Sequence, residues 1–244
     1  MKQVEIFIYE EYEKILKEPG REWVLITGFP GFGYVGTIAT RYIANKMKSV
    51  KIGDIVTKYM PDFVAMEEYG VMTPYEIFLA ENRNLIIVVN NALPTTPERV
   101  PYSLALADWF KKINGKRAVF AGGLNVKLKE GDEEFRWVCN MDCGWSFKEP
   151  KLGKGNYIVG PLATLYAIFT LKKIPTLLIL PYTEPGRYDP SAAAVFIRKL
   201  NEIMEIGVSV DDLIEYSKLV AYAETLMEEA SKKTKEEKGP KLYM

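Results

Sequence analysis

The sequence predicts an α/β fold of three layers, with helices on both faces of a mostly parallel central sheet. Short apolar runs alternate along the chain with helical patterns, and this alternation is typical of strand–helix–strand units whose strands lie parallel. The chain has 244 residues, 48% of them hydrophobic, which is enough to fill the core of one large α/β domain. We therefore expect a single domain over residues 1–231. Residues 232–244 are rich in lysine and glutamate and contain a Gly-Pro break, so they predict a flexible C-terminal tail.

The predicted strands are short apolar runs. The clearest is "NLIIVVNN" at residues 84–91, which is apolar through its centre, as in a buried parallel strand. Residues 61–80 are interrupted by proline and glycine, which favours extended pieces and a hairpin. The other predicted strands are residues 3–9, 22–27, 50–58, 116–121 and 174–182.

Capping residues and prolines mark the starts of several predicted helices. Thr96 stands before Pro97, and Asp189 before Pro190, which is typical of an N-cap followed by the first helical residue. Gly207 is a suitable end for the helix that Asp189 opens. The predicted helices are residues 34–47, 97–113, 160–173, 189–206 and 209–233, the last being unusually long.

The pattern becomes irregular over about residues 127–157, where we expect a hairpin excursion from the domain. Its aromatic residues fit either the core or an interface between subunits, where aromatics are enriched. Cys139 and Cys143 could form a thiol pair or half of a metal site. No histidine or third cysteine completes such a site, so we expect two ordinary unpaired cysteines.

The sequence contains no histidine. Histidine is the usual general base, the partner of nucleophilic serine and cysteine, and the commonest metal ligand. Neither a G-x-S-x-G elbow nor a Walker lysine motif is present. The carboxylate pairs Glu67–Glu68 and Glu133–Glu134 are expected to be solvated. We therefore assign no catalytic residues and expect no metal and no cofactor.

The charge pattern bears on the class of partner. Basic and acidic residues number 32 each, and outside the tail no basic stripe suggests a surface for nucleic acid or an anionic membrane. The first residues lack the apolar segment of a signal peptide, and the longest apolar stretch, 157–171, is too short and too broken for a bilayer span. We expect a soluble, cytoplasmic protein that binds another protein or a small molecule.

The glycines Gly31, Gly33 and Gly36 match G-x-G-x-x-G between a predicted strand and a predicted helix, the context of a dinucleotide-binding turn. Asp54 is near the spacing of the acid that binds ribose, but it precedes the apolar centre of its strand. Bulky aromatic residues also flank the glycines. We favour a tight turn in which the glycines allow close backbone packing. A nucleotide- or nucleoside-binding enzyme that uses this turn is the alternative function.

The chain ends in Leu242, Tyr243 and Met244, directly after the polar run of the tail. Two large apolar groups, an aromatic ring among them, and a terminal carboxylate at the end of a polar tail suggest an anchor rather than a solvated end. This ending resembles the C-terminal motif, a hydrophobic residue, tyrosine and any residue, with which proteasome activators and assembly chaperones dock into pockets between subunits of the proteasome α-ring.

Four further segments carry a resemblance over about residues 4–230. They are "WVLITGFPGFGYVGTIATRYI", "FAGGLN", "YIVGPLATLYAIF" and "EPGRYDPSAAAVFIRKL". In this order and spacing they resemble the archaeal members of the proteasome assembly chaperone family. The resemblance implies a fold similar to nucleoside phosphorylases, a homo-oligomer, and binding to the α-ring through the tails. It implies no catalytic set, and the family's glycine-rich turn matches Gly31, Gly33 and Gly36 without a dinucleotide.

We therefore expect a non-enzymatic protein that docks its C-terminal tails into the α-ring of the 20S proteasome, as an assembly chaperone, an ATP-independent activator or an adaptor. One tail would be a weak ligand, but several tails on one oligomer can raise affinity by roughly 10² to 10⁴. The tail thus favours a homo-oligomer independently of the resemblance. An oligomeric scaffold whose aromatic hairpin binds some other protein is a further possibility.

Overall fold

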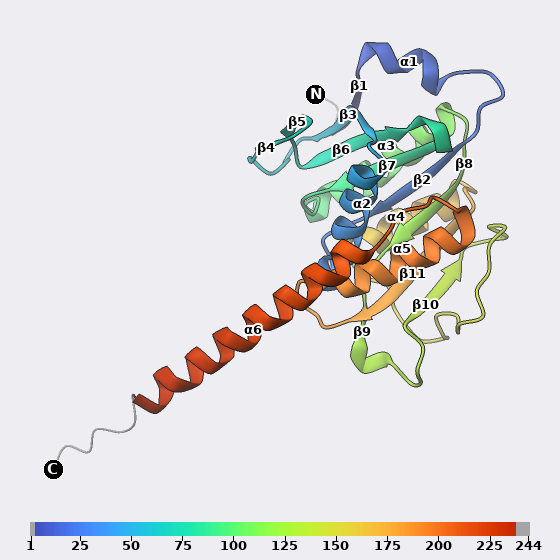
Figure 1. The fold of residues 1–244 in the computed structure, drawn as a ribbon. Coiled ribbons are helices and arrows are strands. Elements are labelled where there is room, and N and C mark those ends of the chain that lie inside the picture. Colours follow the sequence, from blue (N-terminus) through green and yellow to red (C-terminus); the bar gives the residue numbers. More distant parts are fainter. Residues whose placement is uncertain (1–2, 238–244) are drawn as a thin grey trace.

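One large sheet lies between two layers of helices in the computed structural model, which describes residues 3–237 (Figure 1). The strand order is β1-β3-β6-β7-β2-β8-β11-β10, and β9 pairs with β11. A separate hairpin consists of β4 and β5. The strands are β1 Val4–Ile8, β2 Trp23–Gly28, β3 Val50–Thr57, β4 Ala65–Glu67, β5 Gly70–Met72, β6 Tyr75–Ala80, β7 Leu85–Asn90, β8 Gly115–Ala121, β9 Leu124–Asn125, β10 Phe135–Cys139 and β11 Thr176–Thr183.

The centre of the sheet is parallel and its edges are antiparallel. Strand β2 pairs in parallel with β7 and β8, and β8 pairs in parallel with β11. Strands β6, β3 and β1 continue the sheet on one side in antiparallel pairs, and β10 closes the other side in the same way. The predicted α/β class with a largely parallel centre is therefore confirmed, and β7, the clearest predicted strand, is buried at every position.

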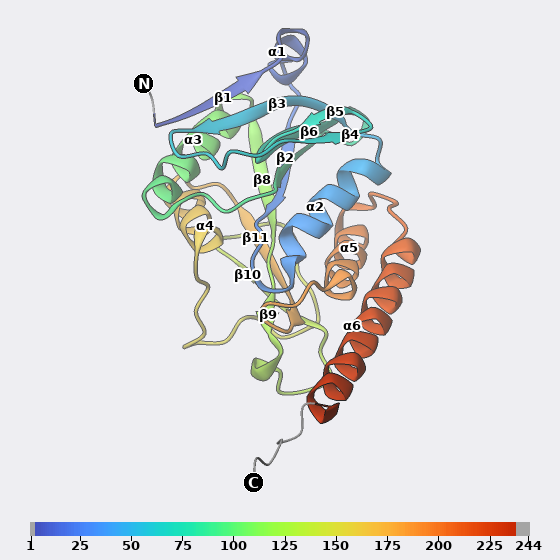
Figure 2. The same cartoon turned by 90° about the vertical axis from the view of Figure 1, so that its left-hand side faces the viewer.

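The helices form a layer on each face, as Figure 2 shows. Helices α2, α5 and the start of α6 cover one face, where Ile43 and Phe196 are fully buried. Helices α3 and α4 cover the other, where Phe110 and Phe169 are fully buried. Among residues 3–237 we find no helix that could cross a membrane. The helices are α1 Glu10–Leu16, α2 Val35–Lys46, α3 Arg99–Lys112, α4 Pro161–Leu171, α5 Pro190–Met204 and α6 Asp211–Glu237.

The helices differ from the sequence-based expectation most clearly in three places. Helix α1 was not expected, because its stretch is dominated by charged residues. A 3-10 turn precedes α3, and the capping box is formed by Thr95 with Glu98 rather than by Thr96. Helix α6 continues to Glu237, four residues beyond the expected end at Lys233. Asp189 caps α5 as predicted, since its side chain accepts a hydrogen bond from the Ala192 N–H at 3.0 Å.

Within residues 127–157, β10 pairs antiparallel with β11 and so belongs to the edge of the main sheet. Phe135 and Trp137 on this strand are buried and both contact the ring of Phe147. Of the aromatics for which core and interface were left open, Phe135 and Trp137 therefore lie in the core of the domain.

The expectation of two unpaired cysteines is wrong. Cys139 ends β10, the chain turns back directly after it, and the Cα atoms of Cys139 and Cys143 come within 6.1 Å, where they form a disulfide. Within the described part of the chain no group of three or more cysteine, aspartate or glutamate side chains could hold a metal ion.

Candidate functional site

Helix α6 is rooted on the folded body through its first turns. Leu213 is buried in the core beside α5, and Ser209, just before the helix, accepts a hydrogen bond from the Asp211 N–H at 3.2 Å. Tyr42 of α2 donates a hydrogen bond to the Ser209 carbonyl at 2.9 Å, and Lys46 pairs with Asp212. These contacts attach the start of α6 to α2 and α5.

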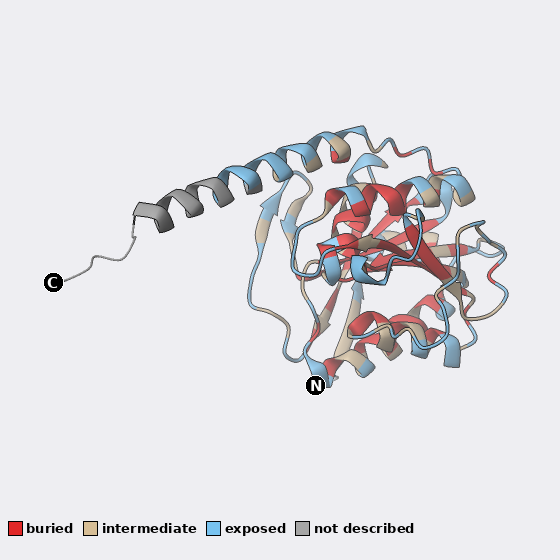
Figure 3. Cartoon of the chain, turned by 90° about the horizontal axis from the view of Figure 1, so that it is seen from below, coloured by how far each residue is buried: buried red, intermediate tan, exposed pale blue. Residues whose placement is uncertain are grey.

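Beyond its root, α6 projects from the body into solvent (Figures 1 and 3). Large apolar side chains stand on this projecting part, with Leu219 65%, Tyr222 66% and Met227 70% exposed. Tyr216, Leu219, Ala223 and Leu226 recur at intervals of three and four residues, which places them along one side of the helix. A long helix with an uncovered apolar side is typical of a surface that packs against a partner.

Three tyrosine rings connect the glycine-rich turn to the root of α6. Tyr34, at the start of α2, lies with its ring centre 6.0 Å from that of Tyr188, and Tyr188 lies 6.2 Å from Tyr216 on α6. Burial raises the pKa of the Tyr188 phenol. The loop that carries Tyr188 is held in turn by a hydrogen bond from the Asp189 N–H to the Gly33 carbonyl at 3.0 Å. The turn therefore helps to position α6.

The glycine-rich turn itself brings α2 close to β2. A Cβ atom at Gly36 would lie 2.4 Å from the Phe29 nitrogen, and one at Gly33, whose φ is +65°, would lie 2.4 Å from the Thr183 side chain. At Gly31, by contrast, the nearest atom would be 4.0 Å away. Gly33 and Gly36 thus serve the close packing that we favoured from the sequence, and Gly31 has open space beside it.

The strand order separates Asp54 from this turn. Asp54 lies on β3, and β6 and β7 stand between β3 and β2 in the sheet. Its carboxylate accepts hydrogen bonds from Thr73 at 2.5 Å and Tyr9 at 3.0 Å. It is therefore not positioned as the ribose-binding acid of a dinucleotide turn, which follows the neighbouring parallel strand.

The two predicted carboxylate pairs are not brought together. Glu67 lies on the β4–β5 hairpin near Arg41, at 3.4 Å. Glu133 and Glu134 precede β10, where Glu134 pairs with Arg198 at 3.1 Å. Hydrogen bonds from its own backbone N–H and from Tyr182 lower the pKa of Glu133. These carboxylates interact with separate arginine and tyrosine partners and form no acid–base pair.

A buried polar cluster around Glu76 was not foreseen from the sequence. The Glu76 side chain is fully buried on β6, where its carboxylate lies 3.2 Å from Lys51 and 3.5 Å from Arg41. It also accepts hydrogen bonds from Asn91 at 2.9 Å and from Tyr69 at 3.1 Å. Because Tyr69 lies in the β4–β5 hairpin, the cluster ties this hairpin to the sheet.

Tyr9 and Asp54 extend this cluster towards the sheet edge. Burial raises the pKa of Tyr9 to about 12, with a further contribution from the negative charge of Asp54. The phenol therefore stays protonated at neutral pH and donates its hydrogen bond to Asp54. Lys51 also contacts Asp54, at 2.8 Å. The charges of this cluster pair with one another, so the arrangement stabilises the edge of the sheet.

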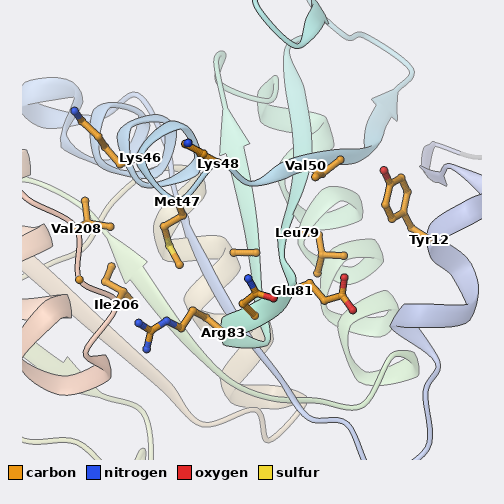
Figure 4. A pocket seen from close by; sticks show the side chains of 13 residues that line it. Tyr12, Lys46, Met47, Lys48, Val50, Leu79, Glu81, Arg83, Ile206 and Val208 are labelled. Carbon is orange, nitrogen blue, oxygen red and sulfur yellow. The ribbon is translucent and has the colours of Figure 1, made fainter.

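A hollow of 420 Å³ lies on another side of the body, between the ends of α2 and β6 (Figure 4). Lys46 and Lys48 lie on one side of it and Arg83 on the other. Lys46 is already paired with Asp212 and Glu81 with Arg21. The charged groups around the hollow do not converge on one point, so they form no catalytic arrangement there.

A family model and several solved structures match this chain. The family model described as the PAC2 family matches residues 25–229, most of the chain. The chain belongs to the PAC2 family. The matched range covers most of the region, about residues 4–230, in which the sequence resembles archaeal proteasome assembly chaperones.

Solved structures share the PAC2 fold. PbaA of Pyrococcus furiosus, an archaeal homolog of proteasome-assembly chaperone, superposes with a TM-score of 0.79 at 20% identity over 97% of this chain and 96% of that one. PbaB of the same organism, an archaeal proteasome activator, gives 0.76 at 18% identity over 93% and 100%. An uncharacterized protein of Methanocaldococcus jannaschii is 24% identical over 212 residues, 82% of this chain and 81% of that protein.

The structure thus brings the glycine-rich turn and the root of α6 together, a connection that the sequence did not suggest. The predicted anchor, Leu242, Tyr243 and Met244, lies outside the described residues. The exposed side of α6 was also missed, although the three- and four-residue spacing from Tyr216 to Leu226 was visible in the sequence. That a helix face stays uncovered depends on tertiary packing, which the pattern alone does not give.

Proposed function

We propose that this PAC2-family chain is a non-enzymatic, homo-oligomeric proteasome-binding protein of the archaeal cytoplasm. Its C-terminal residues Leu242, Tyr243 and Met244 dock into the α-ring of the 20S proteasome, so that the protein acts as an assembly chaperone, an ATP-independent activator or an adaptor. The observation that carries this proposal is the projection of α6 from a body with the fold of PbaA and PbaB.

The length of α6 supports a role as a spacer. From Leu219 to Glu237 a helix rises about 28 Å at 1.5 Å per residue. The residues that follow Glu237 can add at most about 25 Å when extended. A terminal anchor can therefore act well away from the body, at the distance that a pocket in a separate ring requires.

The exposed side of α6 supports the homo-oligomer. An isolated helix is marginally stable in water, and most helices are stabilised by packing of an apolar side. The seven-residue interval from Tyr216 to Ala223, and from Leu219 to Leu226, is the interval at which helices pack side by side in a coiled coil. Packing of α6 against its copies would cover these side chains and gather several tails.

Deletion of residues 242–244 is expected to weaken binding to purified archaeal 20S particles by at least about tenfold, because the apolar anchor is lost and the terminal carboxylate moves to Lys241. Native mass spectrometry of mixtures with α-subunits and with mature particles measures binding and shows which of the two the protein prefers. Met244→Ala is the matched control, since it keeps Leu242, Tyr243 and a terminal carboxylate. Equal binding by the truncated and full-length proteins would refute the proposal.

Replacement of Leu219 by glutamate is expected to reduce the mass of the oligomer in native mass spectrometry, because a buried unpaired charge opposes helix packing. Thr225→Glu introduces the same charge on the opposite side of α6 and is expected to leave the mass unchanged. If both variants keep the wild-type mass, α6 does not hold the subunits together.

A further inference from the structure

A second cavity, of 260 Å³, lies at the carboxyl ends of the central strands, away from α6. The residues that follow β2 and β8 line it, together with Leu180 of β11 and the segment that leads into α4. In sheets with parallel strands this edge is where ligands bind most often. The position alone therefore makes the cavity the first candidate for a small-molecule site in the body.

The lining of this cavity is apolar apart from a few polar groups. Its apolar residues include Phe29, Phe32, Leu124, Leu162 and Leu180. Leu162 and Leu180 are buried, and Phe32 at the rim is exposed. Walls of this kind favour a ligand with an apolar body.

Arg99, at the start of α3, is the one charged residue in the lining. Its Nε atom is buried and has no hydrogen-bond partner among residues 3–237. Buried donors in folded proteins nearly always have a partner, because an unpaired buried donor has lost its hydrogen bond to water. An anionic acceptor that enters the cavity would pair with the guanidinium charge of Arg99, which lies in the lining.

We propose that this cavity binds a small monocarboxylate with an apolar body, whose carboxylate pairs with Arg99. A single arginine with no lysine in the lining matches one negative charge better than the two of a phosphate monoester. The volume has room for roughly nine water-sized groups, which suits an aromatic or branched body of about that size. The proposal concerns the body of the domain and does not depend on the proteasome-binding role.

The test compares two probes that differ in one functional group, 3-phenylpropionate and 3-phenylpropanol, by titration calorimetry at neutral pH. The full-length protein is expected to bind the acid at least about tenfold more tightly than the alcohol, since a charged pair replaces a neutral contact. Arg99→Met is expected to abolish this difference. Arg83→Met removes an exposed arginine outside the cavity and is expected to preserve it. Equal affinity for acid and alcohol in the wild-type protein would overturn the proposal.

The position of the bound acid gives a second criterion, which needs no variant. In methyl NMR of the wild-type protein, 3-phenylpropionate is expected to shift Leu162 and Leu180 and to leave Leu213, on the opposite face of the sheet, unchanged. Shifts confined to residues outside the cavity, or none at saturating probe, would contradict the assignment.

Discussion

Replacement of Glu76 by glutamine is expected to lower the free energy of unfolding by about 3 to 5 kcal/mol, the usual cost of breaking a buried ion pair from one side. The carboxylate is fully buried and lies between Lys51 and Arg41. Glutamine keeps the shape but removes the negative charge, so Lys51, whose side chain is only 9% exposed, loses half of its carboxylate contacts. Its amide group also brings two donors to a place where an acceptor is required.

Denaturant unfolding at a fixed protein concentration measures this loss, because the oligomer that we propose would make apparent stability depend on concentration. Glu67→Gln is the matched control. Glu67 also lies near Arg41, at 3.4 Å, but its side chain is 39% exposed, and exposed pairs contribute about 0 to 1 kcal/mol. Similar losses in the two variants would show that the cluster around Glu76 does not stabilise the edge of the sheet.

Replacement of Gly36 by valine is expected to lower the free energy of unfolding by at least about 3 kcal/mol, or to prevent folding altogether. The added Cβ would lie 2.4 Å from the nitrogen and 2.6 Å from the oxygen of Phe29, both backbone atoms that follow β2. Backbone cannot rotate away as the end of a side chain can. Helix α2 would therefore have to separate from β2, and the buried side chains between them would lose contact.

Gly31→Ala provides the comparison within the same turn. At Gly31 the nearest atom to an added Cβ is 4.0 Å away, so we expect a change within about 0.5 kcal/mol. Thermal and denaturant unfolding of the two variants distinguish a glycine that close packing requires from one that another residue can replace. Equal stability of Gly36→Val and wild type would contradict the packing role.

The central strands could be predicted from the sequence because a buried parallel strand is a short, continuous run of apolar residues. "NLIIVVNN" became β7, and the strand before the glycines became β2. Helix α1 also left a local pattern, with Tyr12, Ile15 and Leu16 at helical spacing. It was obscured by the charged residues around them, most of which are exposed.

The candidate site was predictable only in its parts. The burial of Glu76 depends on Arg41 and Lys51, which lie 35 and 25 residues away in the sequence, and no local pattern joins them. The disulfide between Cys139 and Cys143 depends on the path of an irregular turn, and the cavity beside Arg99 depends on the meeting of five separate segments. The terminal anchor of Leu242, Tyr243 and Met244 stays a prediction.

The rings of Tyr34, Tyr188 and Tyr216 pack together at the root of α6, so a small change of angle there moves the far end of the helix by a larger distance. Helix α6 has 27 residues, about 40 Å at 1.5 Å per residue, so a tilt of about 10° at its root moves its far end by about 7 Å. That displacement exceeds the diameter of a tyrosine ring. The angle at which the three tyrosines meet therefore contributes to where the far end of α6 lies. In the oligomer that we propose, it would affect the spacing between the tails of neighbouring subunits.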